Sequence, residues 1–419
     1  MRKPMTVAVI GCGRFAKNFV PLFKAHPAVA RVLVCDLIPE RAKQYAESFG
    51  VEIIDTFEQA LASSEVDAIA IFTQRDKHGP MAIAALEAGK HVYSAVPCAV
   101  DVADIIRIKE LVERTHLTYS MGETGFYRPA AVFCREEQKK GTFGTFTYGE
   151  AQYNHDVRNM EQSFRSSGGE AWRRYAGIPP MFYPTHSTAM ILSALPGVYV
   201  KRLCAFGYSQ GARDDIYGTE GQNLYGNPFA NTSMLLYLSN GGIARISENR
   251  CIGWRAPETY ISQFYGSEGA YEFSVAHHHL ATYREDDPHN VTMTDVTDRL
   301  MPPEATRMIR ESYADAIQSL ADGFGFGLTS PVQPTARLPK EFEGLHNGHN
   351  GTHHFLIDDF CRACETGKLS PCNIWEVARW NIPGLMAHQS ALAGGETVDV
   401  IDLGAPPADW EVLDYATGR

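Results

Sequence analysis

The chain has no apolar run long enough to cross a membrane. A transmembrane helix needs about 20 consecutive, mainly apolar residues, and the 419-residue sequence contains no such stretch. The first strand-like run begins at Thr6, which leaves no room for the apolar region of a secretory signal. We therefore expect a cytoplasmic protein without a membrane partner.

Positive charge is also scarce. The sequence holds 38 Lys and Arg residues against 49 Asp and Glu residues, which gives a formal net charge of -11. A nucleic-acid partner requires clustered Lys and Arg to neutralise its phosphates. The charge balance therefore argues against nucleic-acid binding.

The nine cysteines lack the spacing of a disulfide framework. An odd, scattered set suits reduced thiols in a reducing compartment. Cys361 and Cys364 form a CxxC pair, but they lie in an amphipathic helical pattern without a second pair at zinc spacing. The run His277–His279 cannot direct three imidazoles to one metal, because consecutive strand residues face opposite sides. We predict core thiols and no metal site.

Short apolar runs alternate with helical patterns through residues 1–123. The predicted strands are Thr6–Ile10, Arg31–Asp36, Asp67–Phe72, His91–Val96 and Leu117–Gly122, and the predicted helices are Arg14–Ala25, Pro39–Phe49, Thr56–Ala62, His78–Ala88 and Val102–Arg114. This alternation builds a doubly wound parallel sheet.

Beyond residue 140, strands follow one another without helices between them. The predicted strands are Thr145–Tyr153, Val200–Ser209, Thr232–Ser239, Ile243–Arg250, Thr259–Tyr265 and Ala270–Val275, and the predicted helices are Gln162–Tyr175, Ser187–Ala194, His353–Thr366 and Asn373–Gly394. Consecutive strands favour an antiparallel sheet. We therefore predict an α+β domain over residues 124–419, with a large, mostly antiparallel open sheet.

The first strand runs into a GxGxxA motif at Gly11–Ala16. Gly11 permits the tight turn, Gly13 lets the backbone approach a pyrophosphate, and Ala16 keeps the following helix close to the sheet. Asp36, at the end of the second strand, is placed to accept hydrogen bonds from ribose hydroxyls, and no Arg follows it. These residues predict a Rossmann domain over residues 1–123 that binds NAD in preference to NADP.

Further stretches carry a family resemblance. Asp67–Ile71, His78 ahead of Ala85–Val92, and Phe355–Phe360 together resemble the Gfo/Idh/MocA family of sugar-acting oxidoreductases. The resemblance implies a Rossmann domain followed by an open sheet that covers the nicotinamide. The predicted cofactor site comprises Gly11, Gly13, Arg14, Phe15, Ala16, Asp36, Thr73, His78, Val96 and Pro97.

Two departures from that family narrow the resemblance. Val96 stands where the family usually has a Lys that helps to move the hydroxyl proton, and Tyr183–His186 replaces its Asp-x-Gly-x-His motif. These features, with Gly149–Arg158 and the loop Gly348–Gly351, are similar to the NAD-dependent glycosidase branch related to alpha-N-acetylgalactosaminidase. The chain departs from that branch after His186, where it has Ser-Thr-Ala in place of Gly-Leu-Gly.

The resemblance implies a redox-neutral glycosidase. In that branch, NAD removes hydride from carbon 3 of the sugar, the proton at carbon 2 becomes acidic, and the aglycone leaves. Water then adds and the hydride returns, so the cofactor is recycled. The expected substrate is a small carbohydrate or glycoside. The alternatives are a net sugar or polyol dehydrogenase without the usual Lys, and an NAD-binding regulator without turnover.

Several polar residues are candidates for this chemistry. His186 is the expected hydroxyl base, because imidazole exchanges protons near neutral pH, and Tyr183 could face the same cavity. Tyr153 matches the branch's carbon-2 base, which requires a lowered tyrosine pKa, and it could instead be core. Glu123 could orient the sugar or the nicotinamide ribose, or could cap a helix.

The remaining expectations concern substrate contacts and assembly. The predicted substrate-binding residues are Trp172, Arg173 and His349. We also expect a homo-oligomer, a dimer or tetramer, that associates through the open sheet. His155 and Asp156, which follow the predicted strand Thr145–Tyr153, are interpreted as strand-end structure or as a hydrogen-bonded pair.

Overall fold

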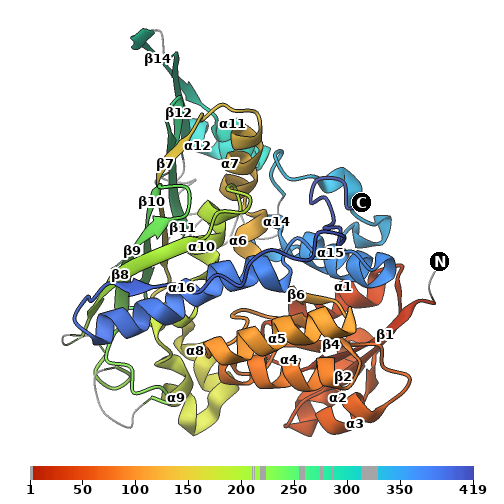
Figure 1. Ribbon diagram of the computed structural model, residues 1–419. Coiled ribbons are helices and arrows are strands. Elements are labelled where there is room, and N and C mark those ends of the chain that lie inside the picture. The colour runs from red at the N-terminus through yellow and green to blue at the C-terminus, as the bar shows by residue number, and fades with distance from the viewer. Residues whose placement is uncertain are drawn as a thin grey trace. The chain divides into compact units, whose positions relative to one another are not determined.

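The computed structural model in Figure 1 describes residues 3–419 apart from a few short gaps. Residues outside the description are 210, 212, 218–222, 254–259, 274–276, 285–286 and 313–328. The chain forms two compact units, neither of which is continuous in sequence. The first unit comprises Met1–Thr124, Pro334–Ala378 and Leu403–Arg419, and the second comprises Gly125–Gln333 and Arg379–Asp402.

These units differ from the division at residue 123. The first unit gains two segments from the C-terminal third of the chain, whereas the second unit is correspondingly smaller. The assignment of residues 1–123 to cofactor binding, and of residues 124–419 to substrate binding and oligomerisation, remains a prediction.

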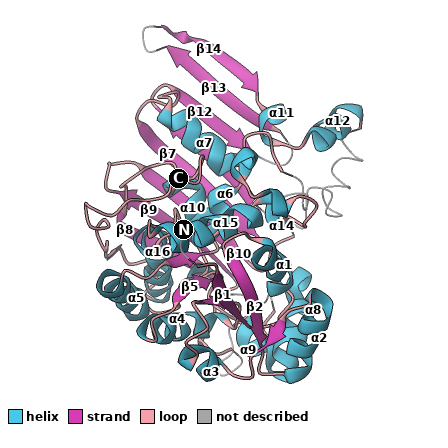
Figure 2. Cartoon of the chain, turned by 90° about the vertical axis from the view of Figure 1, so that its right-hand side faces the viewer, coloured by secondary structure: helices cyan, strands magenta, loops and turns pink. Residues whose placement is uncertain are grey.

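The first unit contains a parallel sheet of six strands in the order β3-β2-β1-β4-β5-β6. Figure 2 labels β1, β2 and β5 of this sheet. The strands are β1 (Met5–Ile10), β2 (Val29–Cys35), β3 (Glu52–Ile53), β4 (Ala68–Ile71), β5 (His91–Ser94) and β6 (Tyr119–Met121). This order confirms the predicted doubly wound sheet. The sequence does not predict β3, because its two exposed residues form no apolar run.

The helices of this sheet follow the predicted punctuation. They are α1 (Val20–Ala25), α2 (Pro39–Phe49), α3 (Phe57–Ala62), α4 (His78–Glu87) and α5 (Val102–Thr115). Asp101 caps α5 by accepting a 2.9 Å hydrogen bond from the Ala103 amide, and Gly50 ends α2 with a positive φ of 60°. The helix expected from Arg14 begins instead as a 3-10 turn at Ala16–Asn18, followed by α1.

A C-terminal helix also belongs to the first unit. The helix α15 (His353–Thr366) places the Phe360 ring 5.6 Å from that of Tyr93 on β5. Two buried carboxylates on α15, Asp358 and Asp359, are ion-paired with Arg337. Cys361 and Cys364 are buried on this helix, as expected of core thiols.

The second unit contains nine strands in the order β14-β13-β12-β11-β7-β10-β9-β8-β15. The strands are β7 (Phe146–Asn154), β8 (Val200–Tyr208), β9 (Asn231–Leu238), β10 (Ile243–Asn249), β11 (Tyr260–Gly266), β12 (Gly269–Phe273), β13 (His278–Arg284), β14 (Asp287–Asp295) and β15 (Val398–Asp399). Only the β7–β10 pair is parallel among these pairings. The predicted mostly antiparallel sheet is confirmed, although Thr259 and residues 274–275 of two predicted strands lie outside the description.

Helices of the second unit pack on one face of the sheet. They are α6 (Thr124–Tyr127), α7 (Pro129–Lys139), α8 (Val157–Gly168), α9 (Trp172–Ala176), α10 (Thr185–Leu192), α11 (Thr297–Leu300), α12 (Pro303–Glu311) and α16 (Ile374–Leu392), which continues from the first unit. A Cβ at Gly149 on β7 would lie 3.1 Å from Ile191, so α10 packs tightly there.

Two details of the second unit differ from expectation. The single helix predicted over Gln162–Tyr175 is wrong, because Gly169 has a positive φ of 57° and separates α8 from α9. The strands β13 and β14 are not predicted, because their polar sequences lack a clear apolar alternation. Among the described residues, no helix combines the length and apolar composition that crossing a membrane requires.

Candidate functional site

The loop after β1 has the geometry of a dinucleotide turn. Gly11 has a positive φ of 99°, and a Cβ there would lie 2.6 Å from the Phe72 carbonyl oxygen, so only glycine fits. At Gly13 a Cβ would meet nothing within 4 Å, which leaves the backbone open to a ligand. Ala16 is buried, whereas Arg14 is exposed and Phe15 half-buried. The open backbone at Gly13 fits a pyrophosphate.

Asp36 is fixed beside this loop by backbone donors. Its Oδ2 accepts a 2.7 Å hydrogen bond from the Cys12 amide, and its Oδ1 accepts a 2.8 Å hydrogen bond from the Ile38 amide. The carboxylate therefore has a defined position at the end of β2, where a ribose binds in Rossmann domains. Its negative charge disfavours a ribose phosphate, which agrees with the preference for NAD.

His78 connects two loops at the same edge of the sheet. Its Nδ1 lies 2.8 Å from the Pro97 carbonyl oxygen and its Nε2 lies 3.2 Å from that of Thr73. Burial lowers the pKa of this imidazole, although both carbonyl contacts act in the opposite direction. His78 thus positions the backbone at Thr73 and Pro97, and Val96 beside Pro97 is buried.

Glu123 and His349, the other two predicted site residues of the first unit, lie apart from His78 in the sequence, one after β6 and the other shortly before α15. Glu123 is fully buried two residues after β6, and it is a lesser cause, after burial, of the raised pKa of Tyr93. His349 has a left-handed φ of 51°, and its Nδ1 lies 2.7 Å from Nε2 of His353. Its ring meets that of Phe15 edge-on at 5.7 Å, so the predicted substrate residue lies beside the dinucleotide loop.

The second unit brings three predicted catalytic residues together. His186 Nε2 and Tyr183 Oη are 2.9 Å apart, and both residues flank the start of α10. The Tyr153 ring lies 5.2 Å from that of His186 and 6.1 Å from that of Tyr183. His186 and Tyr153 are only 2% and 5% exposed, so both side chains are shielded from bulk water.

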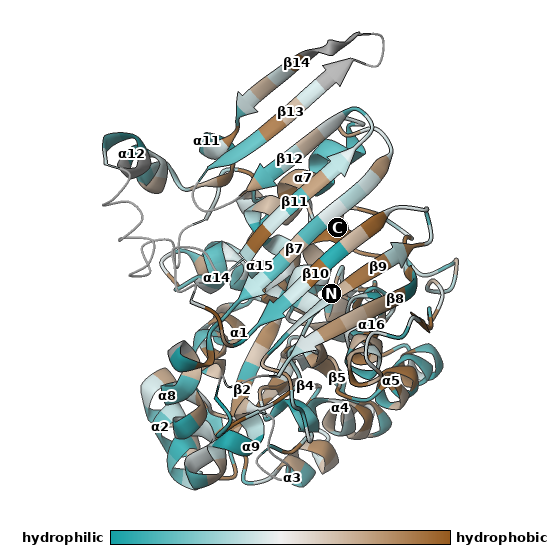
Figure 3. Cartoon of the chain, turned by 90° about the vertical axis from the view of Figure 1, so that its left-hand side faces the viewer, coloured by the Kyte–Doolittle hydropathy of each residue, from teal (hydrophilic) through white to brown (hydrophobic). Residues whose placement is uncertain are grey.

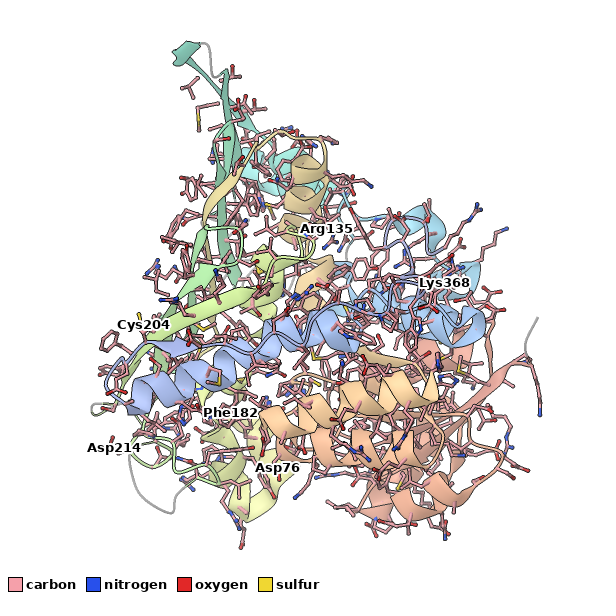
Figure 4. The ribbon with its side chains drawn as sticks, viewed as in Figure 1. Asp76, Arg135, Phe182, Cys204, Asp214 and Lys368 are labelled. Carbon is pink, nitrogen blue, oxygen red and sulfur yellow. The ribbon has the colours of Figure 1, made fainter. Side chains whose placement is uncertain are left out.

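An aromatic stack extends the cluster on one side. Tyr260 of β11 lies parallel to Tyr153 at 4.5 Å, and the Arg128 guanidinium lies 3.4 Å from the centre of the Tyr260 ring. Arg135 on α7, labelled in Figure 4, donates hydrogen bonds to Ser193 Oγ and to the Phe126 carbonyl oxygen, both of 3.1 Å. These bonds fix the segment that carries Arg128.

Buried charges from β10 extend the cluster further. The Arg250 guanidinium lies 4.8 Å from the centre of the Tyr153 ring. Its Nη2 donates a 3.1 Å hydrogen bond to Glu248, which also accepts a 2.6 Å hydrogen bond from Ser187 Oγ on α10. This network joins β10 to α10 beneath the tyrosines.

The pKa of Tyr153 is raised in the protein by burial. Three contacts lower this pKa: the charges of Arg250 and Arg128, and a hydrogen bond with Tyr260. The charge of Glu248 raises it further. Taken together, burial and these side chains therefore do not lower the pKa of Tyr153, and its role as the carbon-2 base stays a prediction.

His155 is a residue that the sequence interpretation missed. Its Nδ1 is hydrogen-bonded to Tyr153 Oη, so it belongs to the cluster. Asp156 does not pair with it, but caps α8 through the Arg158 amide at 2.9 Å. The signal was present, because residues two apart on a strand share a face. Arg128, Glu248, Arg250 and Tyr260 carry no comparable local signal.

Trp172 and Arg173 occupy a different part of the second unit. Trp172 is 2% exposed and packs in an apolar cluster with residues of α8 and α9. Arg173 donates a 3.0 Å hydrogen bond to Asp215 and lies 4.7 Å from the Trp172 ring centre. These contacts occupy both side chains with packing and ion pairing, and their role in substrate binding remains a prediction.

Comparison with known proteins identifies relatives of this chain. A model of the Gfo/Idh/MocA family, described as an oxidoreductase family with an NAD-binding Rossmann fold, matches residues 5–123. A glycosyl hydrolase family 109 protein of Saccharopolyspora erythraea is 30% identical over 43% of this chain and 42% of its own length. Another from Streptomyces niveus is 22% identical over 96% of this chain and 78% of its own length.

A third relative carries a specific activity in its name. The alpha-N-acetylgalactosaminidase of Shewanella oneidensis is 29% identical over 38% of this chain and 35% of its own length. The matches to the S. erythraea and S. oneidensis proteins thus span less than half of those proteins.

Solved structures share the fold at low identity. Levoglucosan dehydrogenase in complex with NADH and L-sorbose has a TM-score of 0.69 at 17% identity, over 96% of this chain and all of the other. An oxidoreductase of Agrobacterium radiobacter in complex with NAD+, L-tartaric acid and magnesium has a TM-score of 0.67 at 16% identity, covering 95% and 98%. At these identities the likeness establishes the fold alone.

Proposed function

We propose that the chain, whose residues 5–123 match the Gfo/Idh/MocA oxidoreductase family, is an NAD-dependent enzyme of that family that cleaves a glycoside without net oxidation. The glycosidase names of its relatives support this reaction class. Bound NAD would supply reversible hydride transfer at carbon 3 of the sugar. Gly11, Gly13 and Asp36 are the residues that would hold the dinucleotide.

His186 receives the proton from the hydroxyl group at carbon 3. Tyr183 Oη, at 2.9 Å from His186 Nε2, orients the imidazole. Burial of His186 excludes water that would otherwise compete for this proton. Val96 is apolar, so the position that usually carries Lys supplies no proton-transfer group here.

Tyr153 removes the proton from carbon 2. The C–H bond at carbon 2 breaks, and its electron pair forms a double bond between carbon 2 and carbon 1. The aglycone leaves with the electrons of its bond to carbon 1. Water then adds to the unsaturated sugar, and the proton returns to carbon 2 from Tyr153. Glu123, Trp172, Arg173 and His349 are the remaining proposed contacts to sugar or cofactor.

The observation that carries this proposal is the pairing of two proton-transfer groups in one buried cluster. Oxidation at carbon 3 and deprotonation at carbon 2 require two groups that reach adjacent carbons. The rings of Tyr153 and His186 are 5.2 Å apart, which suits that requirement. A simple dehydrogenase needs a base at the hydroxyl alone.

A panel of aryl glycosides tests the proposal. The protein is incubated with NAD and each glycoside, while aglycone release and NADH absorbance are followed together. We expect release without net NADH, together with deuterium uptake at carbon 2 in heavy water. NADH that accumulates in proportion to the substrate consumed would instead establish the alternative, a sugar or polyol dehydrogenase in which His186 and Tyr183 replace the usual Lys.

Self-association through the open sheet forms a separate part of the proposal. Along β9, buried and exposed residues alternate, and Leu235 and Tyr237 are 46% and 42% exposed. Figure 3 shows brown, hydrophobic stretches along β8 and β9. Phe206 and Tyr208 on β8 and Ile243 on β10 are exposed as well. Apolar exposure of this kind favours a partner. Analytical ultracentrifugation should detect a dimer or tetramer, and Leu235→Glu should dissociate it.

Localisation is also proposed rather than established. The odd number of cysteines, nine in total, suits a reducing compartment. We therefore propose a cytoplasmic enzyme, which cell fractionation of the native host tests directly.

A further inference from the structure

The cluster of the second unit contains two tyrosine–histidine pairs. Tyr183 Oη and His186 Nε2 form one pair, at 2.9 Å. Tyr153 Oη and His155 Nδ1 form the other. The proposed reaction assigns a role to Tyr183, His186 and Tyr153, and leaves His155 without one.

The backbone explains why His155 lies against the phenol. Tyr153 is the next-to-last residue of β7, and His155 follows the strand directly. The His155 amide donates a 3.0 Å hydrogen bond to the Asn249 carbonyl oxygen, which continues the pairing with β10. Residues 153 and 155 therefore share a face of the sheet, and this face also carries the proposed reaction.

Exposure differs between the two partners. Tyr153 is 5% exposed, whereas the His155 side chain is half-buried. An imidazole between a buried phenol and the solvent can accept a proton from one side and exchange it on the other. His155 therefore offers the buried hydroxyl a route to bulk water.

The charges around the phenol make such a partner useful. Arg250 and Glu248 approach it from β10, Tyr260 and Arg128 from the opposite stack, and Tyr183 and His186 from the segment around α10. Burial outweighs the two guanidinium groups and raises the pKa of the phenol. A protonated phenol cannot remove a proton from carbon.

We propose that His155 is a positioning residue that accepts the phenolic proton of Tyr153 and thereby prepares it as the carbon-2 base. The inference rests on the proposed function. The Tyr153 O–H bond breaks as a bond forms between the proton and His155 Nδ1, which gives a phenolate beside an imidazolium. The phenolate then takes the proton of carbon 2, and both transfers reverse when water has added.

The test separates the carbon-2 step from hydride transfer. His155→Asn keeps a hydrogen-bonding group near the position of Nδ1, but its amide cannot take the proton. His279→Asn is the matched control, because His279 is an exposed strand histidine of the same unit. With p-nitrophenyl alpha-N-acetylgalactosaminide and NAD, deuterium uptake at carbon 2 and the formation of bound NADH are measured separately.

We expect His155→Asn to slow deuterium uptake by about 100-fold, the lower range for loss of a proton-transfer group. Formation of bound NADH should be unchanged, and added imidazole should restore uptake in His155→Ala. Unchanged uptake in His155→Asn would overturn the proposal. A joint loss of uptake and NADH formation without imidazole rescue would also overturn it, by showing a merely structural role.

A second measurement needs neither cofactor nor turnover. The nitrogen resonance of His155 Nδ1, followed by NMR on the selectively labelled protein, should shift in Tyr153→Phe and stay in place in His279→Asn. An unmoved resonance in Tyr153→Phe would refute the hydrogen bond on which the proposal stands. A wild-type protein that forms no bound NADH with any glycoside would instead refute the proposed function. That result is obtained with wild type, so it is distinct from any result obtained with the His155 variants.

Discussion

The buried ion pair between Glu248 and Arg250 allows one prediction to be worked out in full. The two side chains are 0% and 6% exposed, and their charged atoms lie 3.1 Å apart. Glu248→Gln keeps the shape of the side chain but leaves the Arg250 guanidinium without its carboxylate partner. Breaking a buried pair in this way costs about 3–5 kcal/mol. We therefore expect the free energy of unfolding of the second unit to fall by that amount.

A matched control is a more exposed ion pair of the same sheet. Glu150 on β7 is ion-paired with Arg245 on β10, but these side chains are 17% and 45% exposed. Exposed pairs contribute about 0–1 kcal/mol, so Glu150→Gln should have little effect. Urea denaturation followed by circular dichroism, with identical conditions for the three proteins, gives the comparison. Equal stability of the two variants, within about 1 kcal/mol of wild type, would refute the assignment of Glu248–Arg250 as a desolvated pair.

Glu248→Gln should also change the pKa of Tyr153. Glu248 contributes to the raised pKa of Tyr153, and Arg250 opposes it. Removal of the carboxylate charge therefore lowers the pKa of Tyr153 and favours its phenolate. The limb of the pH–rate profile that reports ionisation of Tyr153 should move to lower pH in Glu248→Gln. A shift to higher pH, or loss of the limb in Glu150→Gln, would contradict this reading of the electrostatics.

Three further predictions concern other parts of the molecule. Burial lowers the pKa of His388 from 6.5 to about 4, so the unfolded state binds more protons than the folded state in this pH range. The free energy of unfolding should therefore fall by about 3 kcal/mol as the pH decreases from 6.5 to about 4. In thermal unfolding, His388→Leu should lose less stability than wild type over the same pH range. Asp36→Ala should weaken NADH binding by about tenfold, equivalent to 1.4 kcal/mol, with a smaller loss for NADPH, as measured by fluorescence titration; equal losses would contradict ribose recognition. Tyr153→Phe should retain bound-NADH formation while aglycone release falls by about 10²–10⁴-fold, and a stopped-flow experiment with a chromogenic glycoside would expose any failure of that separation.

The cofactor half of the site follows from local sequence. Gly11, Gly13 and Asp36 lie at the ends of strongly apolar strands, and β1 and β2 pair in register from Thr6 to Ile10. The turn, the open backbone and the carboxylate are therefore determined by short segments whose structure is itself predictable. His78 is also named from the sequence as a cofactor residue, but its contacts with the carbonyl oxygens of Thr73 and Pro97 depend on how β4 and β5 pair.

The catalytic half was only partly predictable. The resemblance indicated Tyr153, Tyr183 and His186, and the structure brings these three together. Arg250 and Tyr260 could not be found in the same way, because nothing in the sequence fixes which strands flank β7. His155 was discoverable from the period of a strand, and was missed because its neighbour Asp156 suggested a local pair.

The parallel pairing of β7 and β10 explains why these missed residues gather at one place. In register, Glu248 lies beside Tyr153 and Asn249 beside Asn154, although the strands are 95 residues apart at this point. Two parallel strands end at the same edge of a sheet, so residues that follow them share that edge, whereas an antiparallel pair would place one end beside the other strand's start. His155 and Arg250 are such residues. Because a slip of one residue turns every side chain to the opposite face, a single-residue insertion within β10 would remove Glu248 and Arg250 from Tyr153 together, and the site therefore depends on this register.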